Sequence, residues 1–360
     1  TLDRSHQEQQ YEGATVIEPK KGFYKEPIAT LDFASLYPSI MIAHNVCYST
    51  LVPSGMAVDP SRTETAPTGE RFVKKSEREG VLPIILRELL AARKVAKRDM
   101  AKETDPIKKA VQNGRQLALK ISANSVYGFT GAIVGQLPCL AISKSVTAYG
   151  RLMIDMTQKT VMEHYSVKNG YKHDAVIVYG DTDSIMINTG VKDYGECIRI
   201  GEGLKKEINK RYTYLQIDVD YVFKRMLLLK KKKYAALKVV SVVNGAVNAQ
   251  REVKGIDLVR RDWSVITKTA GNQLLNLLFS DISRDDFRIK IGEYLTQLAE
   301  NMKEGKIPLE QFVITKSLTH ALREYDSKNN SNNPHVVVAL RMQKSGQIMN
   351  ISYCPNCAPP

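Results

Sequence analysis

Two aspartates, Asp181 and Asp183, are separated by one residue and flanked by apolar runs. Residues 176–178 and 185–187 favour β-strands, so the acids are predicted to lie on the turn of a β-hairpin, with Gly180 letting the backbone reverse. Two carboxylates this close repel each other, and burying them costs several kcal/mol unless a cation compensates. The pair therefore predicts a site for divalent cations. An ordinary turn is the alternative, because Asp and Thr side chains also cap turns.

A third aspartate, Asp32, follows a strand-like run and precedes a helix that is predicted to begin near Ser35. The N–H groups in the first turn of a helix have no intrahelical acceptor and bind anions. A carboxylate for a metal ion thus lies three residues before a phosphate-binding helix start, with Tyr37 next to both. A nucleoside triphosphate carrying Mg²⁺ fits this arrangement. A plain strand-to-helix turn with Asp32 as the cap is the alternative.

Positive charge comes from two predicted helices, residues 82–103 and 107–127, which are separated by an Asp-Pro break. The later turns of the first helix carry Arg93 and Lys97, and the second helix places Lys120 and Asn124 four residues apart on one face. An antiparallel hairpin of these helices brings Arg93 and Lys97 to the side of Lys120. The apolar stripe that packs the first helix is Leu82, Ile85, Leu86, Leu89 and Leu90, and the basic residues expected to be merely solvated are Lys94, Arg98, Lys102, Lys108 and Lys109.

Four segments in order resemble motifs of the family B DNA polymerases: DFASLYPSI at residues 32–40, KISANSVYG at 120–128, YGDTDS at 179–184 and KKKKY at 230–234. The resemblance covers residues 26–340, approximately. It implies an α+β fold of right-hand architecture, with an antiparallel β palm, helical-hairpin fingers and a partial helical thumb.

The resemblance also implies a division of the chain. The expected parts are a polar N-terminal segment (1–23), the first part of the palm (24–81), the fingers (82–131), the palm with the catalytic hairpin (132–256), a partial thumb (257–340) and a divergent tail (341–360). Residues 1–19 are polar and Gln-rich and are expected to be poorly ordered, and 53–80 form a polar excursion. Further helices are predicted at 143–164, 194–212, 273–278 and 287–302, and a strand at 215–219.

Two branches of the family are represented. From about residue 20 to 175 the sequence resembles polymerase delta, for example at residues 35–41 and 114–124. From about residue 185 to 340 it resembles polymerase alpha, for example at residues 227–237 and 255–263. We therefore predict a chimera joined at the Asp-Thr-Asp motif. A recombined gene, an assembly or transcript artefact, and a divergent enzyme are the three origins left open.

The function implied by the resemblance is template-directed nucleotidyl transfer from a dNTP to a primer 3′-hydroxyl in DNA replication, with two Mg²⁺ ions. The catalytic residues are then Asp32, Asp181 and Asp183, and the metal ligands are Asp32, Asp183 and the carbonyl of Phe33. The nucleotide is bound by Phe33, Ser35, Leu36, Tyr37, Arg93, Lys97, Lys120 and Asn124, with Tyr37 excluding a ribose 2′-hydroxyl. Primer-template DNA is bound by Tyr127, Gly128, Thr182, Lys231, Lys232, Tyr234, Arg260 and Arg261.

Composition agrees with a polyanionic partner. The 52 Lys and Arg residues exceed the 38 Asp and Glu residues, which gives a formal net charge of +14. A membrane surface would attract the same charge, but no apolar run reaches the roughly 18 residues of a membrane span, and no secretory signal is recognised. We expect no membrane partner. By resemblance the chain acts in the nucleus with accessory replication subunits.

The five cysteines are odd in number and spread along the chain, so they do not form a disulfide framework. Cys354 and Cys357 make one C-x-x-C pair near the end of the chain. Zinc needs two further ligands, so no structural zinc is expected.

Two rival classes use similar residues. A two-metal nuclease also needs acids and a basic groove, but it has no use for a triphosphate site or a tyrosine filter. A nucleic-acid-binding fragment without catalysis would usually have lost an acid, whereas all three aspartates are present. The family normally carries an exonuclease domain and a complete thumb, which this sequence does not show. We therefore expect weak or absent activity for this chain alone.

Overall fold

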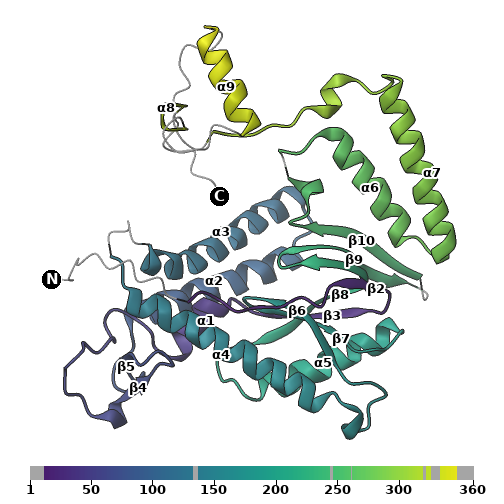
Figure 1. The fold of residues 1–360 in the computed structure, drawn as a ribbon. Coiled ribbons are helices and arrows are strands. Elements are labelled where there is room, and N and C mark those ends of the chain that lie inside the picture. The colour runs from purple at the N-terminus through teal and green to yellow at the C-terminus, as the bar shows by residue number, and fades with distance from the viewer. Residues whose placement is uncertain are drawn as a thin grey trace. The chain divides into compact units, whose positions relative to one another are not determined.

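The computed structural model describes residues 12–132, 137–243, 246–260, 262–318, 322–325 and 333–346. The chain divides into two compact units, Thr1–Lys254 and Gly255–Pro360 (Figure 1). The first unit contains the sheet and its covering helices. The second is helical.

Eight strands of the first unit form one antiparallel sheet in the order β1-β6-β7-β3-β8-β9-β10, with β2 also paired to β8. The strands are β1 (Val16–Ile17), β2 (Gly22–Tyr24), β3 (Ile28–Phe33), β6 (Val176–Asp181), β7 (Ser184–Asn188), β8 (Ile217–Lys230), β9 (Lys233–Val243) and β10 (Ala246–Lys254). This confirms the predicted α+β fold with an antiparallel sheet.

Alternation along the strands decides which face each side chain occupies. Leu31 and Phe33 of β3 pack into the main core, which also contains residues of α4 (Leu140–His164) and α5 (Tyr194–Asn209). Ile28 lies in the core cluster of the opposite face. Both helices lie on one side of the sheet in Figure 1. Because Asp32 lies between Leu31 and Phe33, its carboxylate belongs to the face opposite these helices.

Two long helices, α2 (Val81–Lys102) and α3 (Pro106–Gly131), form the predicted helical hairpin. Asp105 caps α3 by accepting hydrogen bonds from the backbone N–H groups of Ile107 and Lys108, at 2.8 and 3.2 Å. The buried stripe of α2 is narrower than predicted. Leu86 is fully buried, whereas Ile85 is 41% exposed.

The polar excursion before α2, residues 53–80, contains short regular elements. It contains η1 (Pro60–Arg62) and a two-stranded sheet of β4 (Thr63–Thr65) and β5 (Arg71–Val73). Asn45, two residues after α1 (Leu36–Ala43), holds the later end of this segment. Its amide donates to the carbonyls of Val73 and Arg78, and its Oδ1 accepts from the N–H of Gly80.

The expectation that residues 1–19 are poorly ordered is wrong for the part that the structure describes. Val16 and Ile17 form β1, in register with Asp181 and Gly180 of β6. The N–H of Thr182 also donates to the carbonyl of Thr15, at 3.1 Å. Two apolar residues suffice here because the exposed edge of β6 supplies the backbone partners, which is a tertiary effect.

The strand prediction at 215–219 captured only the start of a much longer meander. β8 continues to Lys230, and β9 and β10 follow. The lysine run lies at the β8–β9 turn, where Lys232 adopts a left-handed backbone with φ of 61°. A short η2 (Val167–Asn169) follows α4.

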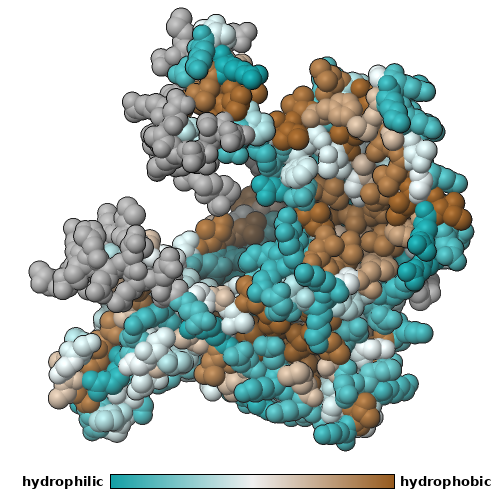
Figure 2. All heavy atoms as spheres, in the orientation of Figure 1, coloured by the Kyte–Doolittle hydropathy of each residue, from teal (hydrophilic) through white to brown (hydrophobic). Residues whose placement is uncertain are grey.

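The second unit consists of η3 (Asp257–Val259), α6 (Val265–Phe279), α7 (Arg284–Lys303), η4 (Leu309–Phe312), α8 (Leu322–Tyr325) and α9 (Pro334–Lys344). The predicted helices at 273–278 and 287–302 are the later parts of α6 and α7. Ser264 and Ser283 cap these helices and set their earlier starts. Figure 2 shows apolar side chains gathered over α6 and α7.

No helix in the described part of the chain is both long and apolar enough to cross a membrane. Cys47, Cys139 and Cys197 are buried free thiols. Cys354 and Cys357 lie outside the described residues.

Candidate active site

The predicted hairpin places Asp183 at a two-residue turn between β6 and β7. The reversal does not use Gly180, as the sequence had indicated, but Thr182, whose φ is 63°. A β-branched residue in this left-handed region is strained and is held only by its surroundings. Gly180 has a different role. A Cβ there would lie 2.9 Å from the carbonyl oxygen of Ser184 and would collide with Ile17 of β1.

Asp32 is brought to the same place by strand pairing. It is in register with Ser184 of β7 on one side and with Asp218 of β8 on the other. The N–H of Phe33 donates to the carbonyl of Asp183, at 2.8 Å. Residues about 150 positions apart in the sequence thus share one backbone hydrogen bond, and the two acids lie side by side at one end of the sheet.

The electrostatics of this acid pair are those of crowded, partly buried carboxylates. Burial, followed by the charges of Asp183 and Asp220, raises the pKa of Asp32 to about 7. Burial and the charge of Asp181 raise the pKa of Asp183. Lys120 opposes both shifts. The fold therefore carries uncompensated negative charge that a cation would relieve.

The oxygen ligands available here suit Mg²⁺, which is completed by substrate and water, better than a metal ion whose ligands all come from the protein. No group of three or more His, Cys, Asp and Glu side chains gathers as a metal site within the described ranges. Mg²⁺ is usually held by one or two carboxylates together with substrate phosphates and water. Asp32 and Asp183 provide the two carboxylates, and a backbone carbonyl such as that of Phe33 is a suitable hard ligand.

The start of α1 lies beside Arg93 of α2. Ser35 precedes the helix in a left-handed conformation, with φ of 52°, and Leu36 is the first helical residue. Nη1 of Arg93 donates to Oγ of Ser35, at 3.3 Å. Burial lowers the pKa of Arg93, and for Lys97 burial comes first and the charges of Arg93 and Lys120 add to the lowering. These three cations therefore share one region, as the helical hairpin predicted.

Tyr37 and Tyr127 join α1 to α3. Their ring centroids lie 4.3 Å apart with an angle of 40° between the rings. Asn124 and Gly128, on neighbouring turns of α3, are exposed. Aromatic rings in contact hold each other in place, so each tyrosine fixes the position of the other.

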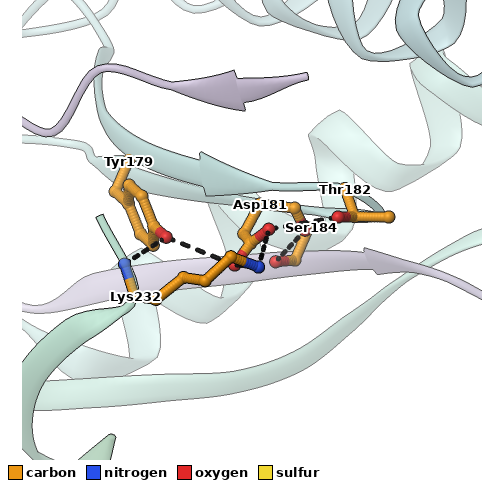
Figure 3. A network of polar contacts seen from close by, with 5 residues as sticks. All are labelled: Tyr179, Asp181, Thr182, Ser184 and Lys232. Carbon is orange, nitrogen blue, oxygen red and sulfur yellow. Dashed lines mark hydrogen bonds and ion pairs between the residues drawn. The ribbon is translucent and has the colours of Figure 1, made fainter. Parts of the chain in front are cut away.

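The carboxylate of Asp181 is hydrogen-bonded within a polar network (Figure 3). Nζ of Lys232 lies 3.0 and 2.9 Å from its two carboxylate oxygens. The hydroxyl of Tyr179 donates to Oδ2 at 3.3 Å, and that of Thr182 donates to Oδ1 at 3.1 Å. The N–H of Lys232 in turn donates to the Tyr179 hydroxyl, at 2.8 Å. This network fastens the β8–β9 turn to the acidic turn.

The remaining predicted DNA-binding residues differ in their surroundings. Lys231 pairs with Glu18, at 2.9 Å. Tyr234 is 6% exposed, and its hydroxyl donates to Glu252. Arg260 belongs to the second unit and donates to Asp262 at 3.1 and 3.2 Å. Arg261 lies outside the described residues.

Sequence reasoning missed three residues of this region. Asp220 raises the pKa of Asp32, Tyr179 anchors the Lys232 turn, and Gln116 contacts Arg93. Acids and apolar residues alternate at 217–220, which is typical of a β-strand and places Asp218 and Asp220 on one face. This pattern could have indicated Asp220. Tyr179 and Gln116 lie in the segments 179–184 and 114–124 that carry the family resemblance, but no local pattern indicates their partners.

Comparisons with known proteins agree with this geometry. A model of DNA polymerase family B matches residues 2–352. The DNA polymerase delta catalytic subunits of Schizosaccharomyces pombe and Drosophila melanogaster are each 46% identical over 346 residues, covering 94% of this chain and 30% of the relative. The chain thus spans about 30% of the length of these curated relatives.

A solved structure is also similar. The family B DNA polymerase from the hyperthermophilic archaeon Pyrobaculum calidifontis aligns with a TM-score of 0.66 and 28% identity, covering 95% of this chain and 40% of that chain. The family model extends over nearly the whole sequence and includes Asp32, the Asp181–Asp183 turn and the lysines of the β8–β9 turn. The chain therefore belongs to DNA polymerase family B.

Proposed function

We propose that this site carries out template-directed nucleotidyl transfer from a dNTP to a primer 3′-hydroxyl, as a DNA-directed DNA polymerase of DNA replication. The observation that carries the proposal is the convergence of Asp32 and Asp183 at the ends of paired strands, near the charge of Lys120. In the reaction the 3′-oxygen bonds to the α-phosphorus of the dNTP, and the bond to pyrophosphate breaks.

Asp32, Asp183 and the Phe33 carbonyl hold the two Mg²⁺ ions in this proposal. Bound Mg²⁺ supplies charge stabilisation at the attacking and leaving oxygens. Burial and neighbouring carboxylates raise the pKa of both aspartates, and this supports the assignment, because a doubly ionised pair needs positive charge beside it. Asp181 serves catalysis by position, since its oxygens are engaged by Lys232, Tyr179 and Thr182.

The triphosphate is bound by cations and by the start of α1. Arg93, Lys97 and Lys120 offset the negative charge that develops on the phosphates, and the Ser35 and Leu36 amides and Asn124 bind beside them. Contact between Arg93 and Ser35 supports this placement. Tyr37, braced by Tyr127, excludes a ribose 2′-hydroxyl.

Primer-template DNA is the proposed macromolecular partner. Lys231, Lys232, Tyr234, Tyr127, Gly128 and Thr182 in the first unit, with Arg260 and Arg261 in the second, contact it. Lysine contacts to phosphate carry charge but little sequence information. Because Tyr234 is buried, we propose that it supports the β8–β9 turn and that its ring makes little direct contact with the DNA.

The sheet and α4–α5 correspond in this proposal to the palm (24–81 and 132–256), the α2–α3 hairpin to the fingers (82–131) and the second unit to part of the thumb (257–340). Residues 1–23 form the N-terminal segment and 341–360 a divergent tail. Likeness to delta catalytic subunits supports action in the nucleus with accessory replication subunits.

Primer extension tests the proposal directly. The purified chain is incubated with a labelled primer-template, dNTPs and Mg²⁺, beside Asp183→Asn and the exposed-site control Asp155→Asn. We expect extension by the wild type and the control, and a loss of at least about a thousandfold in Asp183→Asn. Undiminished extension by Asp183→Asn contradicts the metal assignment. DNA binding without extension by any of the three proteins favours the alternative of a catalytically inactive binding fragment.

We also propose that the chain joins a delta-like segment (20–175) to an alpha-like segment (185–340) at the Asp-Thr-Asp motif. The sequences quoted above on each side of that motif support this. Long-read sequencing of genomic DNA across the codons of residues 174–188 tests it. One uninterrupted locus would exclude an assembly or transcript artefact. A break in the locus would exclude a natural chimeric gene.

A further inference from the structure

The buried face of α3 contains one polar residue that packing alone does not explain. Gln116, Ala123 and Thr130 are the buried residues of this helix and lie at intervals of seven, so they share one face. Gln116 is only 7% exposed. A buried amide costs free energy unless its donors and acceptor are hydrogen-bonded, and an apolar residue would fill the same place without that cost.

The two ends of the Gln116 amide have different partners. Nε2 donates to Oδ1 of Asn113 on the preceding turn, at 2.9 Å. Oε1 accepts from Nε of Arg93 across the hairpin, at 3.5 Å. Because Asn113 takes the NH₂ group, the acceptor end of the amide stays on the side of the guanidinium. The reverse orientation would set two donors against each other.

Arg93 is thereby held at two points. Its Nε contacts Gln116, and its Nη1 donates to Ser35 at the start of α1, at 3.3 Å. Fixing Nε restricts the last torsions of a long, flexible side chain, and a preorganised cation binds phosphate more tightly because less rotamer freedom is lost on binding. The long Arg93–Gln116 distance leaves room for this contact to shorten when an anion occupies the site.

We infer that Gln116 is a positioning residue that aims Arg93 at the phosphate-binding start of α1. The inference rests on the proposed function only in taking that start as the place of the dNTP triphosphate. Gln116 itself does not touch the nucleotide. It sets the affinity for the polyphosphate, and it does so through Arg93.

The test uses Gln116→Leu, which keeps the size of the side chain but removes the acceptor. Gln112→Leu is the matched control, because Gln112 lies one turn earlier on α3 and its Oε1 is buried without a hydrogen-bond partner. Two quantities are measured for each variant: the apparent KM for dNTP in primer extension, and the Kd for inorganic pyrophosphate by calorimetry. Thermal unfolding verifies that each variant is folded.

We expect Gln116→Leu to raise both the KM and the pyrophosphate Kd about fivefold to tenfold, with kcat within about twofold of the wild type. Gln112→Leu should stay within about twofold in both. In an Arg93→Ala background, Gln116→Leu should add no further increase, since its effect passes through Arg93.

Three results would overturn the inference. Gln116→Leu could leave the pyrophosphate Kd unchanged, could weaken binding equally in the Arg93→Ala background, or could be matched by Gln112→Leu. Failure of the proposed function is distinguishable, because a chain that binds pyrophosphate but does not extend a primer still allows the Kd comparison. A wild-type chain that binds no pyrophosphate contradicts the inference as well.

Discussion

Nζ of Lys232 lies 3.0 and 2.9 Å from the two carboxylate oxygens of Asp181, so the lysine turn and the acidic turn are joined across the sheet. The ammonium group is two-thirds exposed, and an exposed ion pair contributes at most about 1 kcal/mol to stability. We therefore expect the Lys232–Asp181 pair to affect DNA affinity more than the free energy of unfolding. In the proposed complex with DNA, the single positive charge of Lys232 is shared between Asp181 and a DNA phosphate.

This competition predicts opposite effects of the two partners on DNA affinity. In EDTA, Asp181→Asn should tighten binding of primer-template about threefold, because it removes a negative charge and releases Lys232. Lys232→Met should weaken binding and reduce the slope of log K against log salt by about one. Fluorescence anisotropy across a salt series measures both. Equal weakening by the two substitutions would show that the pair acts as one structural unit instead.

The raised pKa of Asp32 predicts that this residue lowers the free energy of unfolding of the metal-free protein as the pH rises. The carboxyl has a pKa of about 7 in the folded chain, above its ordinary value. Its contribution to stability is fully present below about pH 4 and is lost as the pH rises through 7, because the unfolded chain releases the proton more easily. Asp32→Asn should thus match the wild type at pH 4 and exceed it by about 1–2 kcal/mol at pH 8, after allowance for partial solvent access.

Urea unfolding in EDTA at the two pH values measures this difference. Asp155→Asn, the same substitution on the exposed side of α4, is the control and should follow the wild type at both pH values. A wild-type chain that is more stable than Asp32→Asn at pH 8 without metal would contradict the electrostatic description of the site.

Tyr37, whose ring is braced by Tyr127, is the proposed sugar filter. Tyr37→Ala should raise incorporation of rNTP relative to dNTP by at least about tenfold, since the steric barrier to the 2′-hydroxyl is removed. Tyr37→Phe keeps the ring and should keep the selectivity. Single-nucleotide extension with paired dNTP and rNTP substrates measures the ratio of kcat/KM. An unchanged ratio in Tyr37→Ala would place the filter elsewhere.

Gly180 is required by close packing rather than by the turn. A Cβ at this position would meet Ile17 and lie 2.9 Å from the Ser184 carbonyl, which is backbone and cannot move aside. Gly180→Ala should therefore destabilise the protein by about 1–3 kcal/mol. Gly203→Ala on α5, where nothing lies within 4 Å of the added carbon, should be neutral or stabilising by up to about 1 kcal/mol. Thermal unfolding compares them, and equal effects would exclude the packing explanation.

The sequence by itself determined the elements whose signals are local. The apolar runs on either side of Asp181 and Asp183 specified the hairpin, the Asp-Pro break at residues 105–106 separated α2 from α3, and the four-residue spacing of Lys120 and Asn124 placed them on one helix face. Side-chain period and capping are properties of a few neighbouring residues, so they can be read without the fold.

Tertiary structure alone decided how these parts combine. The pairing of β3 with β7 set Asp32 beside the acidic turn, the edge of β6 turned Val16 and Ile17 into a strand, and the β8–β9 turn carried Lys232 to Asp181. Burial of Gln116 against Arg93 arises in the same way. Each depends on strands or helices that meet only after the intervening chain has folded, and no local pattern encodes which distant partner a backbone edge or a buried amide will find.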